Sequence, residues 1–174
     1  LFVGKLTRTK GCFSLIKAFN LCAAVRPDIR LKLAGTGDVG SLKTMIDPEY
    51  KDRVIFMGYC DRERLKEEID DCSFACIPSY FENFSMVPLE IMARGKTIIY
   101  TSRTSGPEIV DDGIDGFTVD PDDVVGLASK MILLTDDHEL RNRMASHAYE
   151  KIEERFSMKA IVQNLVDFYS GICD

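Results

Sequence analysis

The chain has 174 residues, 45% of them hydrophobic and 29% charged, and its 22 basic and 28 acidic side chains give a net charge of −6 at pH 7. This composition is typical of a soluble globular protein and predicts one domain over residues 1–174. The acidic balance argues against nucleic acid and anionic membrane surfaces as partners. The sequence shows no signal peptide and no apolar run of the roughly 20 residues that span a bilayer.

Short apolar runs alternate with amphipathic stretches along the first two thirds of the chain. The runs "LFVGK", "IRLKLAG", "RVIFMG", "FACIP" and "TIIYT" are too short for helices and predict strands buried on both faces. Strands alternating with helices at this spacing predict an α/β fold with a single Rossmann-like, doubly wound parallel sheet. Three extra helices follow over about 122–134, 136–153 and 157–172, and Asp136 and Ser157 are the expected N-caps of the last two.

The cysteines predict a reducing environment. None of them forms a C-x-x-C pair, and several lie inside apolar runs, where a free thiol behaves as a small hydrophobic side chain. Buried, reduced thiols are typical of cytosolic proteins. The six positions are Cys12, Cys22, Cys60, Cys72, Cys76 and Cys173.

The stretch "LAGTGDVGSL" matches the dinucleotide-binding pattern G-x-G-x-x-G at Gly35, Gly37 and Gly40, with Asp61 at the distance of a ribose-binding carboxylate. Two features argue against that interpretation. A strand and a helix precede the glycines, and Asp38 is a natural N-cap that would repel a pyrophosphate. We therefore expect a tight turn and keep an NAD-dependent oxidoreductase domain as the less favoured alternative.

The loop after the first predicted strand, "GKLTRTKG", gathers three cations at the edge where ligands bind in such a sheet. Lys5, Arg8 and Lys10 form a plausible pyrophosphate clamp, and Gly4 and Gly11 allow close backbone approach. A solvated basic loop is the simpler alternative.

The stretch "CIPSYFENFSMVPLEIMARG" places a polar, aromatic loop between a buried strand and a helix with Pro88 in its first turn. Ser85 is the expected N-cap. Glu82 and Glu90 flank the helix start, and carboxylates are good acceptors for sugar hydroxyls. This arrangement indicates a diphosphate with a sugar at each end, although both carboxylates are equally compatible with ordinary surface charges.

Five segments occur in the order seen in family 4 glycosyltransferases: "VGKLTRTKGCFSLIKAF", "LAGTGD", "VIFMGY", "PSYFENFSMVPLEIMARGKTII" and "SGPEIVDDGIDGFTV". Over roughly residues 2–155 the chain resembles the C-terminal, nucleotide-sugar-binding domain of that family's GT-B fold. The most specific part of the resemblance is the E-x7-E pair, Glu82 and Glu90.

The resemblance implies roles for individual residues. Lys5, which stands where the family usually has Arg, and Lys10 would contact the donor diphosphate and act as electrostatic catalysts. Glu82 would orient the transferred sugar, and Glu90 would hold the ribose. The remaining donor-binding positions are Gly4 and Arg8 in the first loop, Tyr59 and Cys60 beside the nucleobase, and Asn83, Phe84, Ser85 and Met86 around the phosphates.

The resemblance further implies a retaining transferase that uses a nucleoside-diphosphate sugar, with a UDP-sugar favoured, and needs no metal. The acceptor, a glycan or lipid-linked sugar in polysaccharide biosynthesis, would bind an N-terminal domain absent from this chain. The chain alone would then bind donor but transfer little sugar. We expect a cytoplasmic protein that could attach peripherally to the inner membrane face through that domain. A non-catalytic nucleotide-sugar-binding module is the main alternative.

Overall fold

The computed structural model describes residues 1–103 and 105–171 and contains six short parallel strands. They form two three-stranded sheets, ordered β1-β2-β3 and β4-β5-β6. The Leu1 amino group donates to the Phe74 carbonyl (2.9 Å) and the Cys76 amide to the Leu1 carbonyl (2.8 Å), so the sheets join at β1 and β4. The strands are β1 (Phe2–Val3), β2 (Leu31–Ala34), β3 (Val54–Gly58), β4 (Ala75–Ile77), β5 (Ile98–Thr101) and β6 (Gly116–Val119).

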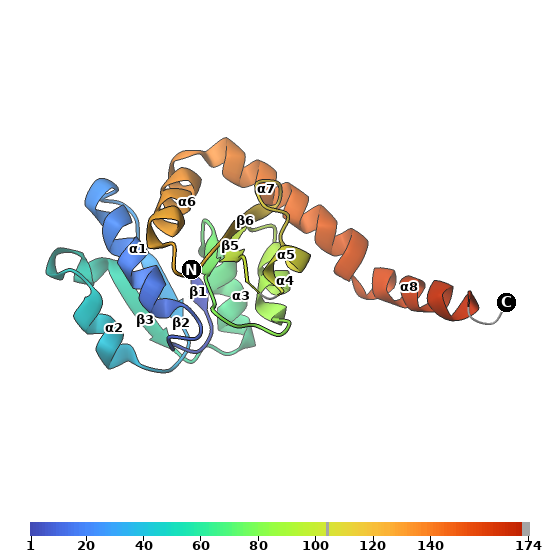
Figure 1. The fold of residues 1–174 in the computed structure, drawn as a ribbon, viewed down its shortest axis with the longest axis horizontal. Coiled ribbons are helices and arrows are strands. Elements are labelled where there is room, and N and C mark those ends of the chain that lie inside the picture. The colour runs from blue at the N-terminus through green and yellow to red at the C-terminus, as the bar shows by residue number, and fades with distance from the viewer. Residues whose placement is uncertain (104, 172–174) are drawn as a thin grey trace.

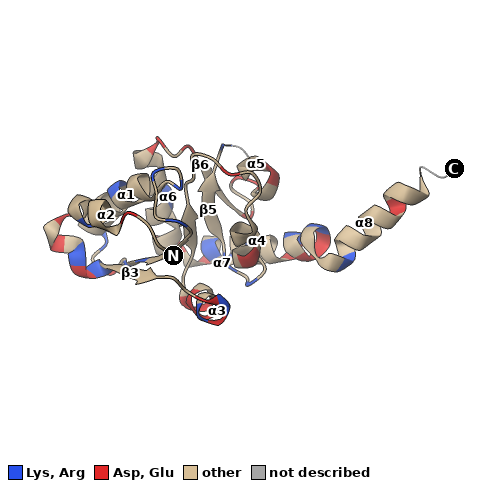
Figure 2. Ribbon diagram, turned by 90° about the horizontal axis from the view of Figure 1, so that it is seen from below, with Lys and Arg blue, Asp and Glu red and all other residues tan. Residues whose placement is uncertain are grey.

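The joined order, 3-2-1-4-5-6, is that of a doubly wound fold and confirms the predicted class. Helices α1, α2 and α6 lie on one side of the strands and α3 on the other (Figure 2). The helices are α1 (Cys12–Val25), α2 (Val39–Met45), α3 (Arg62–Asp71), α4 (Met86–Met92), α5 (Gly106–Ile109), α6 (Val124–Asp136), α7 (His138–Lys151) and α8 (Met158–Ser170), with a 3₁₀ turn at Pro48–Arg53 and a π-helical turn at Ile152–Phe156.

Aspartate and serine side chains begin most of these helices, as the sequence predicts. Asp38 accepts a hydrogen bond from the Ser41 amide (3.0 Å). Asp61 caps α3 in the same way through Arg64, which gives this carboxylate a structural role. One expectation is wrong by a residue: Asp136 ends α6, and Asp137 caps α7.

The core lies between the strands and their helices, and every residue of β4 and β5 is buried. The five described cysteines are free thiols, and all except the half-buried Cys60 are buried. Burial raises the pKa of Cys12, Cys22 and Cys76 to about 12, so these thiols stay neutral. Cys173 lies outside the described residues.

The glycines of "GTGDVG" serve backbone packing between two loops. A Cβ on Gly35 would lie 1.8 Å from the Gly4 carbonyl oxygen, and one on Gly37 would lie 2.4 Å from that of Leu6. The Asp38 amide also donates to the Leu6 carbonyl (2.8 Å). These close contacts explain why positions 35 and 37 are glycines, and they agree with the tight turn that the sequence predicts.

The loop between β1 and α1 (residues 4–11, hereafter the first loop) touches the loop between β4 and α4 (residues 78–85, hereafter the Glu82 loop). Gly11 adopts the left-handed conformation (φ 75°), and a Cβ there would lie 1.8 Å from the Pro78 carbonyl oxygen. Glycine is therefore required at position 11 both by its φ and by space.

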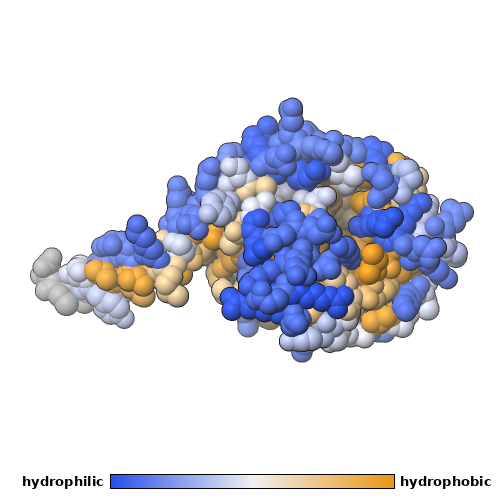
Figure 3. Space-filling model, turned by 180° about the vertical axis from the view of Figure 1, so that it is seen from behind, coloured by the Kyte–Doolittle hydropathy of each residue, from blue (hydrophilic) through white to orange (hydrophobic). Residues whose placement is uncertain are grey.

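Helix α8 projects from the body of the molecule, and none of its residues is buried (Figure 1). Apolar residues run along one side of the projecting segment (Figure 3). They are Met158, Ile161, Val162, Leu165 and Val166, followed by Phe168 and Tyr169. Among the described residues, no helix is long and apolar enough to cross a membrane.

Gly11→Ala should destabilise the fold by roughly 2–4 kcal/mol, because the methyl group meets a main-chain carbonyl that cannot move without displacing β4. Gly113→Ala is the matched control, since Gly113 has a similar φ (79°) but open space around it. It should cost only about 1 kcal/mol of conformational strain. Urea unfolding of both variants measures the difference, and equal losses would contradict the close contact.

Candidate functional site

The first loop and the Glu82 loop meet where the strand order reverses. They follow β1 and β4, the two strands at which the sheets join. The Tyr80 amide donates to the Thr9 carbonyl (2.8 Å) and adds a hydrogen bond to the Gly11 packing. In open parallel sheets, ligands bind in the crevice at this switch point, beyond the carboxyl ends of the strands.

An ion pair joins the two loops across this crevice. Lys10 Nζ lies 2.7 Å from Glu82 Oε1, and Ser79 Oγ donates to the same oxygen at 2.9 Å. The Glu82 side chain is 7% exposed and that of Lys10 is 31% exposed. The sequence therefore predicts both residues correctly for the same edge of the sheet. Their direct pairing is found only in the structure.

A second network holds the Glu82 loop from the other side. The Tyr80 hydroxyl donates to Asp122 Oδ1 (2.7 Å) and lies 3.1 Å from Ser14 Oγ. The Arg103 guanidinium lies over the Tyr80 ring, 5.2 Å from its centre, and pairs with Asp120 and Asp122. The Tyr80 hydroxyl and then Arg103 lower the pKa of Asp122, so the network stays ionised at neutral pH.

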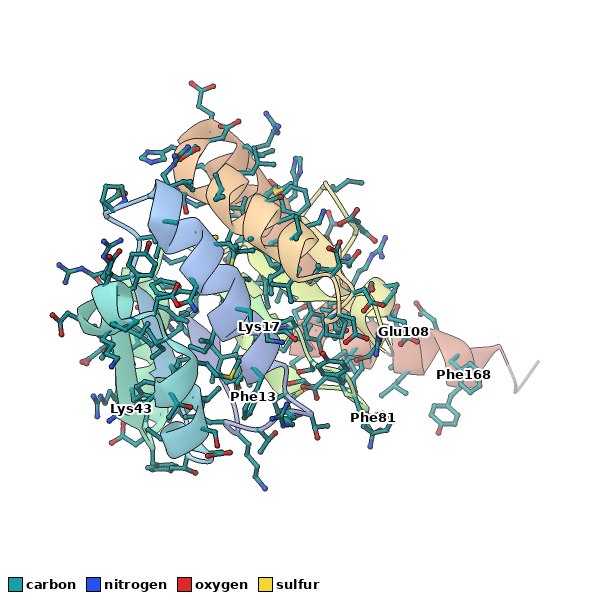
Figure 4. All side chains as sticks on the ribbon, turned by 60° about the vertical axis from the view of Figure 1, so that its left-hand side comes forward. Phe13, Lys17, Lys43, Phe81, Glu108 and Phe168 are labelled. Carbon is teal, nitrogen blue, oxygen red and sulfur yellow. The ribbon has the colours of Figure 1, made fainter. Side chains whose placement is uncertain are left out.

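Arg8 and Lys5, the other members of the predicted cation clamp, are not at the ion pair. The Arg8 guanidinium stacks over the Phe13 ring, 4.2 Å from its centre, and Lys5 is exposed. Figure 4 shows Phe13 at the start of α1 and Phe81 in the Glu82 loop, both toward the lower side of that view.

Helix α4 begins at Met86, as predicted, and Pro88 is buried in its first turn. Ser85 occupies the N-cap position, but its side chain makes no capping hydrogen bond, contrary to the expected cap. Glu90 lies one turn into the helix and is exposed, in contrast to the buried Glu82. The E-x7-E pair thus places one carboxylate inside the protein and one at its surface.

The remaining predicted positions lie in the first loop, directly after β3 and around the start of α4. Gly4 is half-buried, and its carbonyl packs against Gly35 in the loop between β2 and α2. Tyr59 follows β3 and is 78% exposed, and Cys60 beside it is half-buried. Asn83, Phe84 and Met86 are exposed. Glu108 is exposed on α5 (Figure 4).

Two buried hydroxyls, those of Tyr100 and Ser105, are missing from the sequence-based prediction. Tyr100 Oη and Ser105 Oγ are buried and have no geometrically satisfactory hydrogen bond within the described part of the chain. Burial, and to a lesser degree the Glu82 charge, raises the pKa of Tyr100 to about 12, although the nearby Ser105 hydroxyl opposes this shift. The Tyr100 phenol is therefore neutral at physiological pH. A tyrosine within a continuous apolar strand gives no local sequence signal that its hydroxyl is buried without a satisfactory hydrogen bond.

A cavity of about 380 Å³ lies elsewhere, near the amino ends of β1 and β2, and its lining includes Leu1, Arg30 and His138. No predicted donor-binding residue lines it. Within residues 1–103 and 105–171, no cluster of His, Cys, Asp or Glu is arranged to hold a metal ion.

Solved structures share this fold. The C-terminal domain of a glycosyl transferase group 1 family protein from Francisella tularensis matches with a TM-score of 0.81 and 24% identity, over 90% of this chain and 85% of that domain. HepE from Anabaena, solved in complex with UDP, matches with a TM-score of 0.86 and 25% identity, over 98% of this chain and 48% of its own. The chain therefore has the fold of the C-terminal domain of a GT-B glycosyltransferase.

Comparison of the sequence also identifies the chain as a glycosyltransferase domain. The family model of glycosyl transferases group 1 matches residues 1–151, and the chain belongs to this family. It is 28% identical over 173 residues to glycogen synthase of Mycobacterium tuberculosis and 27% identical over 174 residues to alpha-D-kanosaminyltransferase of Streptomyces kanamyceticus. These alignments cover 97% and 99% of this chain but only 41% and 45% of the relatives. The chain thus spans less than half the length of these relatives.

Tyr80→Phe should lower the melting temperature by about 3 °C at pH 7, because the hydrogen bonds to Asp122 and Ser14 are lost. The pKa of Asp122 is lowered in the folded state, so this contribution is present above the carboxyl's ordinary pKa and is lost as the pH falls through the lowered value. The difference from wild type should therefore shrink in acid. Tyr59→Phe, at an exposed position, is the control, and an equal effect of both variants would contradict the network.

Proposed function

We propose that this chain binds the nucleoside-diphosphate sugar donor of a retaining glycosyltransferase at the junction of the first loop and the Glu82 loop. The observation that carries the proposal is the Lys10–Glu82 pair at the switch point of the sheet, where a cation suited to phosphate adjoins a carboxylate suited to sugar hydroxyls. Lys10 and Lys5 would stabilise the leaving diphosphate, and Glu82 would orient the transferred sugar. Glu90 would accept hydrogen bonds from the ribose.

UDP is the favoured nucleotide in this proposal. Support comes from HepE, whose 25% identical structure holds UDP. The exposed Tyr59 and the half-buried Cys60 follow β3 and would lie beside the base, while the backbone around Asn83, Phe84, Ser85 and Met86 would contact the phosphates.

We include in the proposal that the donor binds without a metal ion, since lysines can neutralise the diphosphate directly. The acceptor, a glycan or lipid-linked sugar in polysaccharide biosynthesis, would be bound by a further domain. Because a transfer site then needs both parts, this chain alone would bind donor and transfer little sugar. We also propose that the protein is located in the cytoplasm.

Thermal-shift binding tests the donor assignment, with UDP, ADP, GDP and CDP, their glucose conjugates and NAD as probes. A ligand at about ten times its Kd adds about 1.4 kcal/mol, or a few degrees in melting temperature. UDP and UDP-glucose should raise the melting temperature of the wild type, and Lys10→Met and Glu90→Gln should abolish most of that rise. Lys66→Met, which removes a surface lysine of α3, is the matched control and should respond as wild type.

A shift produced by NAD that survives both substitutions would contradict the proposed site and would favour a dinucleotide site at "GTGDVG". Excess EDTA should leave the UDP-induced shift unchanged. A shift lost in EDTA and restored by Mg²⁺ would contradict the metal-independent part of the proposal.

The stereochemical part of the proposal requires the chain together with its acceptor-binding partner domain. With an α-linked UDP-sugar, the glycosidic bond of the product should keep the α configuration, as read from the anomeric proton coupling in NMR. A β-linked product would contradict the retaining mechanism and leave the donor site itself unaffected.

A further inference from the structure

The Glu82 loop has a tether that is separate from the Lys10 ion pair. The Tyr80 hydroxyl donates to Asp122 Oδ1 at 2.7 Å, and Arg103 Nη2 donates to the other oxygen of Asp122 at 2.6 Å. Arg103 also donates to both oxygens of Asp120, from Nε at 3.2 Å and from Nη2 at 2.7 Å. One arginine in the loop between β5 and α5 thereby joins the Glu82 loop to the turn between β6 and α6.

This tether fixes orientation more than it stabilises the fold. The Arg103 side chain is 36% exposed and that of Asp122 is 66% exposed, and ion pairs as exposed as these contribute little to stability. A guanidinium that forms a fork with one carboxylate has a defined orientation, however, which an ammonium group would lack. Because this guanidinium also lies over the Tyr80 ring, it holds the ring in one place.

The tether bears more on Glu82 than on the groups proposed to contact the diphosphate. Tyr80 precedes Glu82 by two positions in the same loop. The first loop, which carries Lys10, is held separately by backbone hydrogen bonds of Leu6 to the loop after β2. The start of α4 is held by the buried Pro88. Loss of the tether should therefore move Glu82 and leave the diphosphate groups in place.

We propose that Arg103 is a positioning residue for the transferred sugar. It acts through Tyr80, without contacting the ligand, and holds the Glu82 loop so that the carboxylate meets the sugar hydroxyls. The inference rests on the proposed function, which assigns Glu82 to the sugar. The loop after β5 and the turn after β6 then contribute to sugar binding although neither supplies a group to the sugar.

Isothermal titration of the chain with UDP and with UDP-glucose tests the inference, and the ADP and GDP pairs serve if the base differs. Arg103→Met removes the guanidinium and keeps an unbranched side chain. Its affinity for UDP-glucose should fall about fivefold and its affinity for UDP less than twofold. A role in stability alone predicts wild-type affinities well below the melting temperature. Unchanged affinities, or an equal loss for both ligands, would overturn the inference.

A double-mutant cycle separates positioning through Tyr80 from direct contact between Arg103 and the ligand. Tyr80→Leu alone should also weaken binding of UDP-glucose about fivefold. In the Tyr80→Leu background, Arg103→Met should cause no further loss, because the ring that it orients is gone. The same additional loss in both backgrounds would show direct contact and overturn the inference.

Two conservative variants separate geometry from charge, and they serve also if a larger change prevents folding. Arg103→Lys keeps the positive charge but loses the fork, so it should show most of the loss seen in Arg103→Met. Wild-type affinity in Arg103→Lys would show attraction by charge alone and overturn the inference. Asp122→Asn keeps an oxygen that accepts from Tyr80 but weakens the pair with Arg103, so it should cause a smaller loss in the same direction.

Arg94→Met is the matched control, because Arg94 also pairs with an aspartate, Asp70 of α3, beyond the last residue of α4. It should change neither affinity. If the wild type binds both ligands and Arg103→Met binds them equally well, the inference fails and the proposed function stands. If the wild type binds no nucleoside diphosphate and no sugar conjugate, the proposed function fails, and the inference with it.

Discussion

The backbone contact between Gly11 and Pro78 is the constraint on which the site depends. It lets the first loop lie directly on the carbonyl at the end of β4, so that residues distant in sequence become neighbours. Lys10 then reaches Glu82, and the Thr9 carbonyl accepts from the Tyr80 amide. A side chain at position 11 would separate the loops and leave the ion pair to solvent. The contact between Lys10 and Glu82 therefore depends on glycine, which has no Cβ, at position 11.

The site divides its charges between an inner and an outer pair. Lys10 and Glu82 are held together, the carboxylate almost buried, whereas Lys5 and Glu90 are exposed. An ion pair with a nearly buried carboxylate is costly to disturb, because a buried charge is poorly hydrated. Exposed charges attract a ligand at little cost and discriminate weakly. Approach and discrimination can therefore rest on different residues of the two loops and the start of α4.

Much of this arrangement could be predicted from local sequence. Short apolar runs gave the strands, and the positions of "GKLTRTKG" and "PSYFENFS" after two of them placed Lys10 and Glu82 at one sheet edge. The Tyr80–Asp122 bond could not be predicted, because it joins residues 42 positions apart through the packing of β6 beside β5. The choice of Lys10 rather than Lys5 or Arg8 as the partner of Glu82 depends on loop geometry. Likewise, which of the adjacent Asp136 and Asp137 caps α7 is decided by where α6 ends.

The end of α7 has a mechanical consequence for the projecting helix. Lys151 is 7% exposed and pairs with Asp115 (2.8 Å) and Asp111 (2.9 Å), which fastens the last residue of α7 to the turn before β6. The π-helical turn Ile152–Phe156 follows directly and leads into α8. The geometry of that turn therefore sets the angle between α7 and α8, and α8 extends about 20 Å beyond it. A rotation of about 10° at the turn would carry its far end through roughly 3–4 Å, so a few residues beside Lys151 set the direction of the entire apolar face of α8.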